Sequence, residues 1–93
     1  MTTVFIPAQL RDLTGGVEQI AISIPPGETR TVREILDELE RLHPGLEERL
    51  LVEGDLTPYL AVFIDGEPAG LGLQARVKQE HQVYFLAPVV GGD

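Results

Sequence analysis

The chain has 93 residues, of which 43% are hydrophobic and 24% are charged, and this length gives one domain with a modest core. Its formal net charge of −8 disfavours binding to nucleic acid or to an anionic membrane and favours protein partners with basic patches. It contains no cysteine, which excludes disulfides, thiol nucleophiles and thiolate metal sites. The N-terminus has neither a basic start nor a long apolar run, so the expected location is cytoplasmic.

The first quarter of the chain predicts two strands. Residues 4–6 favour a short strand, and residues 17–24 have apolar Val17, Ile20, Ile22 and Ile24, the last three at the two-residue spacing of a half-buried strand. The connection over residues 7–16 ends in Gly15-Gly16, which allows the positive φ angles of a closing turn. A hairpin is therefore expected.

A helix is predicted from Thr31 to about His43. Thr31 and Glu34 have the spacing of a capping box, in which each side chain bonds the backbone amide of the other residue. Pro44-Gly45 ends the helical pattern, and residues 46–51 are expected to add one further helical turn. One apolar stripe predicts the helix face that packs on the core, and it consists of Val32, Ile35, Leu36, Leu39 and Leu42.

The second half of the chain predicts two more strands. Residues 59–64 and 82–87 are rich in β-branched and aromatic residues, and the low charge of the latter predicts a central strand buried on both faces. Asp65-Gly66 is typical of a tight turn. Residues 53–55 are expected to form a polar loop, and residues 76–80 a polar, exposed stretch.

The order of these elements is strand, strand, helix, strand, strand. It predicts an α+β fold of the β-grasp (ubiquitin-like) type, with one main crossover helix on a mixed sheet of four to five strands. In that topology the first and last strands pair in parallel at the centre of the sheet. Residues 1–88 are expected to form the β-grasp domain, and residues 89–93 a flexible C-terminal tail.

The tail is the most informative feature for function. It reads Val89-Val90-Gly91-Gly92-Asp93, so a pair of glycines precedes the last residue. Because glycine has no Cβ, an extended Gly-Gly segment can enter a channel too narrow for any side chain. This favours a role in which the carboxyl end is presented to an enzyme. The terminal carboxylate, however, belongs to Asp93 and not to Gly92.

Other candidate sites have simpler explanations. His43, at a helix end, and His81, before a strand, have no carboxylate at metal-ligand spacing, so no metal site is predicted. Ser23 lies within a strand and lacks the sharp turn of a nucleophile elbow. The helix carboxylates are explained by solvation and pairing, and no pair stands out for acid–base chemistry. The chain is therefore not expected to be an enzyme.

Several short stretches, spread over nearly the whole chain, support a family resemblance together with this tail. They are Ile6-Pro7 with Leu10-Arg11, Thr14-Gly15-Gly16, Glu48-Arg49-Leu50, Ile64-Asp65-Gly66-Glu67 and Val89-Val90-Gly91-Gly92. With the β-grasp order, they resemble the sulfur-carrier branch of the ubiquitin-like proteins, the MoaD/ThiS superfamily. Within it, the chain looks most like the CysO-type carrier of thiocarboxylate-dependent cysteine biosynthesis.

The resemblance implies a carrier cycle. An ATP-dependent activating enzyme of the ubiquitin-activating type adenylates the carboxylate of the terminal glycine, and a sulfur donor converts it to a thiocarboxylate. By this resemblance Gly92 carries the sulfur, Gly91 gives clearance, and Val89 and Val90 contact the partner channels. The acceptor is a cysteine synthase or the large subunit of molybdopterin synthase. ATP is used by the activating enzyme, and the chain itself binds no cofactor.

Asp93 departs from the family pattern, and three explanations are open. A C-terminal peptidase removes Asp93 before activation, or the extra residue is tolerated or trimmed in another way, or conjugation has been lost and the chain acts only by binding. The alternative to a carrier is a ubiquitin-like modifier whose tail forms isopeptide bonds. Carrier and modifier share the activation step and differ in what becomes attached to Gly92.

Overall fold

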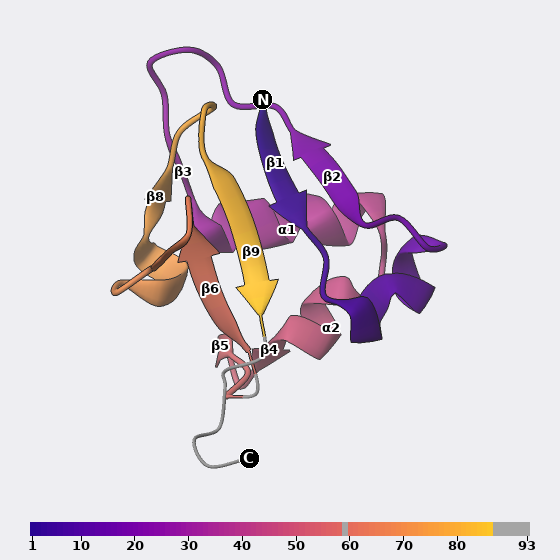
Figure 1. Ribbon diagram of the computed structural model, residues 1–93. Coiled ribbons are helices and arrows are strands. Elements are labelled where there is room, and N and C mark those ends of the chain that lie inside the picture. Colours follow the sequence, from indigo (N-terminus) through magenta and orange to yellow (C-terminus); the bar gives the residue numbers. More distant parts are fainter. Residues whose placement is uncertain (59, 87–93) are drawn as a thin grey trace.

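The computed structural model describes residues 1–58 and 60–86, and its largest element is a five-stranded mixed sheet of order β2-β1-β9-β6-β7 (Figure 1). The strands of this sheet are β1 (Thr2–Phe5), β2 (Gln19–Ile22), β6 (Ala61–Ile64), β7 (Glu67–Pro68) and β9 (Gln82–Leu86). Two short ladders pair β3 (Arg30–Thr31) with β8 (Arg76–Val77) and β4 (Leu51–Val52) with β5 (Asp55–Leu56). The helices are α1 (Val32–Leu42), α2 (Leu46–Leu50) and two 3-10 segments, η1 (Ala8–Thr14) and η2 (Gly72–Gln74).

The predicted β-grasp topology is confirmed. Strands β1 and β9 pair in parallel at the centre of the sheet, and the other neighbours in the sheet are antiparallel. Helix α1 crosses one face of the sheet and lies behind the strands in Figure 1. The fold is therefore α+β, with one main helix covering one side of a mixed sheet.

Helix α1 begins as the sequence predicts. The Thr31 hydroxyl accepts a hydrogen bond from the Glu34 amide (3.1 Å), and a Glu34 carboxylate oxygen accepts one from the Thr31 amide (2.8 Å). The hydrogen bond from the Thr31 backbone is the main cause that lowers the pKa of Glu34. At the other end His43 is the C-cap, and its amide donates to the Leu39 carbonyl. Both ends are thus fixed by local hydrogen bonds.

The core is apolar and lies between α1 and the sheet. Val32, Ile35, Leu36 and Leu39 are buried as predicted, but Leu42 is 41% exposed because it is the last residue of α1, at the edge of the stripe. The expectation that residues 76–80 are exposed is wrong for Val77, which is fully buried. Its burial follows from the pairing of β8 with β3 directly before α1.

The prediction that the last strand is buried on both faces is also wrong. Val83 and Phe85 are buried on the side of α1, whereas Gln82 and Leu86 are exposed and Tyr84 is half-buried. Among the described residues α1 covers only one face, so alternate residues of β9 point away from the core. We call this second surface the open face.

Turn chemistry explains two further features. Glu53 and Gly54 have φ angles of 53° and 85°, and Asp65 and Gly66 have 53° and 84°, so each pair has the two positive φ angles of a type I′ hairpin turn. The second turn was predicted and joins β6 to β7. The first was expected to be a loop and instead closes the β4–β5 hairpin.

Strand boundaries and one connection differ from the sequence-based expectation. The strand expected at residues 4–6 is Thr2–Phe5, and the strand expected at 17–24 is the shorter Gln19–Ile22. The connection between them is longer than a simple turn and contains η1, which places Leu10 in the core. Within residues 1–58 and 60–86, no helix has the length and apolar character to span a bilayer.

Candidate functional site

The described part of the chain ends at Leu86, the last residue of β9. The predicted site residues Val89, Val90, Gly91, Gly92 and Asp93 lie outside the described residues, and their roles stay predictions. The structure does fix the strand that precedes them. Strand β9 is hydrogen-bonded to β1 on one side and to β6 on the other, so the chain reaches its last described residue, Leu86, at the centre of the sheet.

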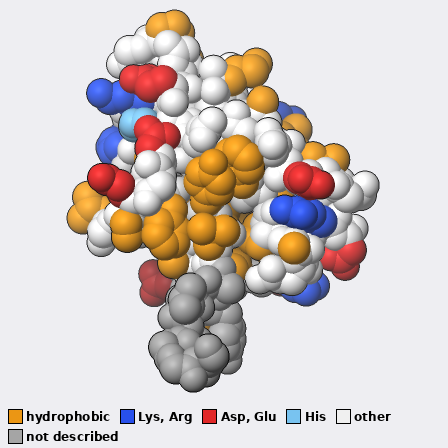
Figure 2. Space-filling model, in the orientation of Figure 1, with side chains coloured by type: hydrophobic (Ala, Val, Ile, Leu, Met, Phe, Trp, Pro, Cys, Tyr) orange, Lys and Arg blue, Asp and Glu red, His pale blue; other side chains and the backbone are white. Residues whose placement is uncertain are grey.

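Aromatic side chains cross the open face beside this anchor. The rings of Phe5 and Tyr84 stack with centroids 4.2 Å apart and planes 6° apart. Phe63 on β6 is the cross-strand partner of Tyr84, so the three residues form a row over β1, β9 and β6. Figure 2 shows hydrophobic side chains gathered at the centre of this face. Apolar side chains that gather on a surface are typical of a protein interaction site.

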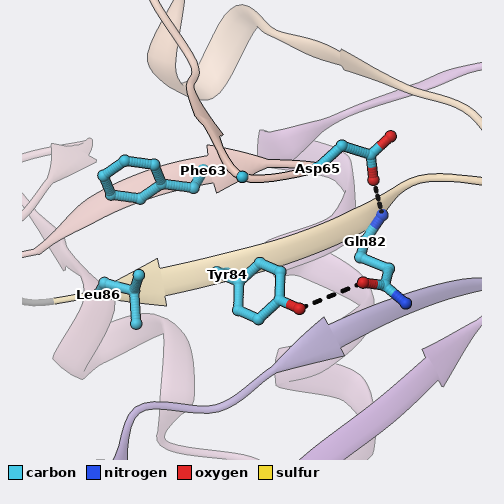
Figure 3. Close-up of a pocket in the computed structure, with 6 residues that line it drawn as sticks. Phe63, Asp65, Gln82, Tyr84 and Leu86 are labelled. Carbon is cyan, nitrogen blue, oxygen red and sulfur yellow. Dashed lines mark hydrogen bonds between the residues drawn. The ribbon is translucent and has the colours of Figure 1, made fainter.

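A groove of about 540 Å³ follows β9 across this face (Figure 3). Phe63 and Leu86 lie toward one end and Asp65 and Gln82 lie at the other, with Tyr84 between them. Gly66 completes the lining. Leu86 is 47% exposed although it is a leucine in a central strand. The groove therefore runs from Leu86, the last described residue, to the carboxylate of Asp65.

Hydrogen bonds hold the polar end of this groove. One Asp65 carboxylate oxygen, Oδ1, accepts a hydrogen bond from the backbone N–H of Gln82 (2.8 Å), and the Tyr84 hydroxyl donates to the Gln82 side-chain oxygen, Oε1 (3.2 Å). The second Asp65 oxygen, Oδ2, lies 3.9 Å from His81 Nε2, too far for a hydrogen bond. His81 Nδ1 accepts from the Lys78 amide (2.9 Å).

The remaining candidate residues do not form a site together. His43 is a helix cap, and Ser23 is exposed beyond the end of β2. Glu40 accepts hydrogen bonds from the amides of Gly45 and Glu47 and so joins α1 to the start of α2. Within the ranges that the structure describes, no three His, Asp or Glu residues are grouped to hold a metal ion.

Sequence reasoning did not find the groove. Its aromatic wall comes from Phe63 on β6 and Tyr84 on β9, which are distant in sequence and meet only through strand pairing. One signal was available, because Gln82–Leu86 carries no charged residue. A single helix can cover only one face of a sheet, so the other face of such an uncharged strand is left for solvent or for a partner protein.

The arrangement defines a class. A β-grasp sheet with one covering helix, an open apolar face and the last described strand at its centre is the architecture of ubiquitin-like proteins. The model of the ThiS family matches residues 4–92, and the chain belongs to this family. It is thus a member of the MoaD/ThiS superfamily of ubiquitin-like carriers, as the sequence resemblance predicted.

Solved structures agree with this assignment. A chain of the BexX/CysO complex from Amycolatopsis orientalis is 34% identical, with a TM-score of 0.84, over 99% of this chain and 100% of that one. CysO of Mycobacterium tuberculosis is 27% identical, with a TM-score of 0.81, over 96% and 100% of the two chains. SAMP1 of Haloferax volcanii is 26% identical, with a TM-score of 0.76, over 98% of each chain. A comparison with curated protein sequences finds no match. The relatives support a sulfur-carrier or modifier role.

Proposed function

We propose that this protein is a sulfur carrier that is adenylated and then thiocarboxylated at Gly92 after removal of Asp93. The observation that carries the proposal is the extent of the family match, which runs through Gly91 and Gly92 and leaves Asp93 outside. A match that ends at the second glycine supports Gly92 as the functional carboxyl end. A peptidase that hydrolyses the Gly92–Asp93 bond supplies the mature form.

The chemistry requires only a carboxylate from this chain. The Gly92 carboxylate attacks the α-phosphorus of ATP on the activating enzyme, and pyrophosphate leaves. A sulfide donor then attacks the acyl carbon of this mixed anhydride, AMP leaves, and the thiocarboxylate remains. The chain supplies no acid or base to either step and is a co-substrate of its partner enzymes. An end without side chains at Gly91 and Gly92 lets more than one enzyme hold the same carboxyl group.

Partner enzymes complete the proposed cycle. A relative of this chain is found in a complex with BexX, which supports a partner enzyme for this chain as well. We favour an acceptor that makes cysteine or a related thiol, because the relatives with 34% and 27% identity come from CysO structures. The molybdopterin synthase large subunit is the alternative acceptor. We assign the cycle to the cytoplasm, where ATP and the biosynthetic acceptors are available.

A protein modifier is the second candidate, since SAMP1, a small archaeal modifier protein, is 26% identical to this chain. In this role Gly92 forms an isopeptide bond with a lysine of another protein. Lys78 is the only lysine of the chain, so polymers linked through internal lysines could grow only at this residue. A domain that binds partners without conjugation is the third possibility.

Intact mass spectrometry of the protein from its native cells separates these candidates. Loss of Asp93 together with replacement of one oxygen by sulfur is the expected result. Attachment of the tail to lysines of other proteins would establish the modifier. A full-length, unmodified chain under conditions of active sulfur transfer would contradict both the carrier and the modifier and would favour a domain that binds partners without conjugation.

A second experiment tests the activation step directly. We expect the chain that ends at Gly92 to support ATP–pyrophosphate exchange by the purified activating enzyme of the same organism. A chain without residues 91–93 should not, although its melting temperature should be unchanged because a tail contributes little burial. A large fall in melting temperature on truncation would contradict a free tail.

A further inference from the structure

The groove on the open face has a single charged group. Of its six lining residues, only Asp65 carries a charge, and the others are two aromatic residues, one leucine, one glutamine and one glycine. Asp65 also lies opposite the end where Leu86 leads into the predicted tail. A protein that binds the tail and covers this face therefore meets an apolar surface that ends in one carboxylate.

The Asp65 carboxylate has a fixed orientation. Its Oδ1 accepts a hydrogen bond from the backbone N–H of Gln82 at 2.8 Å, which connects the β6–β7 turn to β9. Its Oδ2 makes no hydrogen bond to His81, whose Nε2 is 3.9 Å away. His81 Nδ1 accepts from the Lys78 amide, so the neutral ring carries its proton on Nε2. The side chain of Asp65 is 51% exposed, so an incoming donor can reach Oδ2 beside the His81 ring, with which Oδ2 makes an ion-pair contact when His81 is protonated.

A guanidinium group matches this arrangement better than other groups. It is planar and can stack on the ring of Tyr84, which lies between the two ends of the groove, while its N–H groups donate to the Asp65 carboxylate. A lysine ammonium is a compact and strongly hydrated charge, and it gains less from an aromatic wall. The net charge of −8 also attracts a basic partner surface to this chain.

From these observations we infer that an arginine side chain of the activating enzyme lies in the groove along β9 and forms an ion pair with Asp65. The inference rests on the proposed function, since it names the partner as the enzyme that adenylates the tail. Because Oδ1 is already held by Gln82, little side-chain freedom is lost on binding, and the ion pair contributes to affinity as well as to orientation.

The test uses chains that all end at Gly92, the proposed mature form, and compares two substitutions that each remove one negative charge. Asp65→Asn keeps the acceptor for the Gln82 amide, and asparagine tolerates the φ angle of 53° at this position. Glu67→Gln is the matched control, because Glu67 is exposed on the adjacent strand β7 and does not line the groove. The Kd for the purified activating enzyme of the same organism is measured by calorimetry at low and high salt. ATP–pyrophosphate exchange and melting temperature are measured on the same samples.

We expect Asp65→Asn to raise the Kd about tenfold, with a weaker dependence on salt, as for loss of one charged hydrogen bond. Glu67→Gln should stay within about twofold of the unsubstituted chain. Equal Kd values for the two variants would overturn the inference and leave the proposed function intact. Tight binding without exchange would contradict the proposed function, while the two Kd values would still decide the role of Asp65. Neither binding nor exchange by the unsubstituted chain would overturn both.

Discussion

Phe5 and Tyr84 stack on the open face of the sheet, with ring centroids 4.2 Å apart and ring planes 6° apart. The two residues are neighbours in the parallel pairing of β1 with β9, so this contact connects the first and last strands of the fold. Val83 and Phe85 of β9 are buried toward α1, so Tyr84, which lies between them in sequence, carries the stack on the side that α1 leaves uncovered. It therefore stabilises the central pairing without belonging to the main core.

The first prediction concerns the energy of this stack. In a double-mutant cycle with Phe5→Leu and Tyr84→Leu, we expect a coupling free energy of about 0.5–1.5 kcal/mol, beyond the area that each ring buries. Urea unfolding of the four proteins measures it. Strictly additive losses would show that the two rings are adjacent without interacting.

A second prediction contrasts two leucines of α1. Leu39 is fully buried, whereas Leu42 is 41% exposed. Leu39→Ala should lower the free energy of unfolding by about 2–5 kcal/mol because it leaves a cavity in the core. Leu42→Ala should change it by no more than about 0.5 kcal/mol, as for an ordinary surface position. Similar losses for both variants, measured by urea unfolding, would contradict the packing of α1 described above.

A third prediction concerns the turn that carries Asp65. Gly66 has a φ angle of 84°, which L residues rarely adopt, whereas Gly70 has no such restriction, and a Cβ at either position meets no atom within 4 Å. Gly66→Ala should therefore cost about 1–2 kcal/mol through backbone strain alone. Gly70→Ala serves as the control and should be neutral or slightly stabilising in thermal unfolding. Equal melting temperatures would show that the turn changes its conformation at no cost.

Features set by neighbouring residues in the chain could be predicted from the sequence. The Thr31 and Glu34 side chains determine where α1 begins, and Asp65-Gly66 determines a hairpin turn, because each signal acts within a few residues. Burial could not be predicted in the same way. Val77 was expected to be exposed, and it is buried because β8 pairs with a strand far away in sequence.

The candidate site divides along the same line. The Gly91-Gly92 pair is visible in the sequence because its chemistry depends on the absence of side chains. The groove is not visible, because Phe63, Asp65 and Tyr84 meet only after β6 and β9 have paired in the correct register. A sequence pattern reports which face of a strand is apolar, but it does not report whether a helix covers that face.

A fourth prediction concerns pH and the contact between α1 and α2. A hydrogen bond with Asp37 is the largest cause that raises the pKa of Glu47, followed by burial and the charge of Asp37, while the charge of Arg33 opposes them. One Glu47 oxygen, Oε2, is buried without a hydrogen-bond partner among the described residues. The ionised form of Glu47 is thus disfavoured in the folded state.

The sign of the pH dependence follows from this direction. The pKa of Glu47 in the folded protein lies above the ordinary value of 4.5. Between these two pKa values the folded protein therefore binds more protons than the unfolded chain. The contribution of Glu47 to stability is fully present below pH 4.5 and is lost as the pH rises through the folded pKa. Glu47→Gln should remove this loss and make the protein more stable than the unsubstituted chain at neutral pH. Glu48→Gln, which removes an exposed neighbouring charge, is the control. Urea unfolding across this pH range measures the effect, and parallel pH profiles for all three proteins would show that Glu47 is not the group responsible.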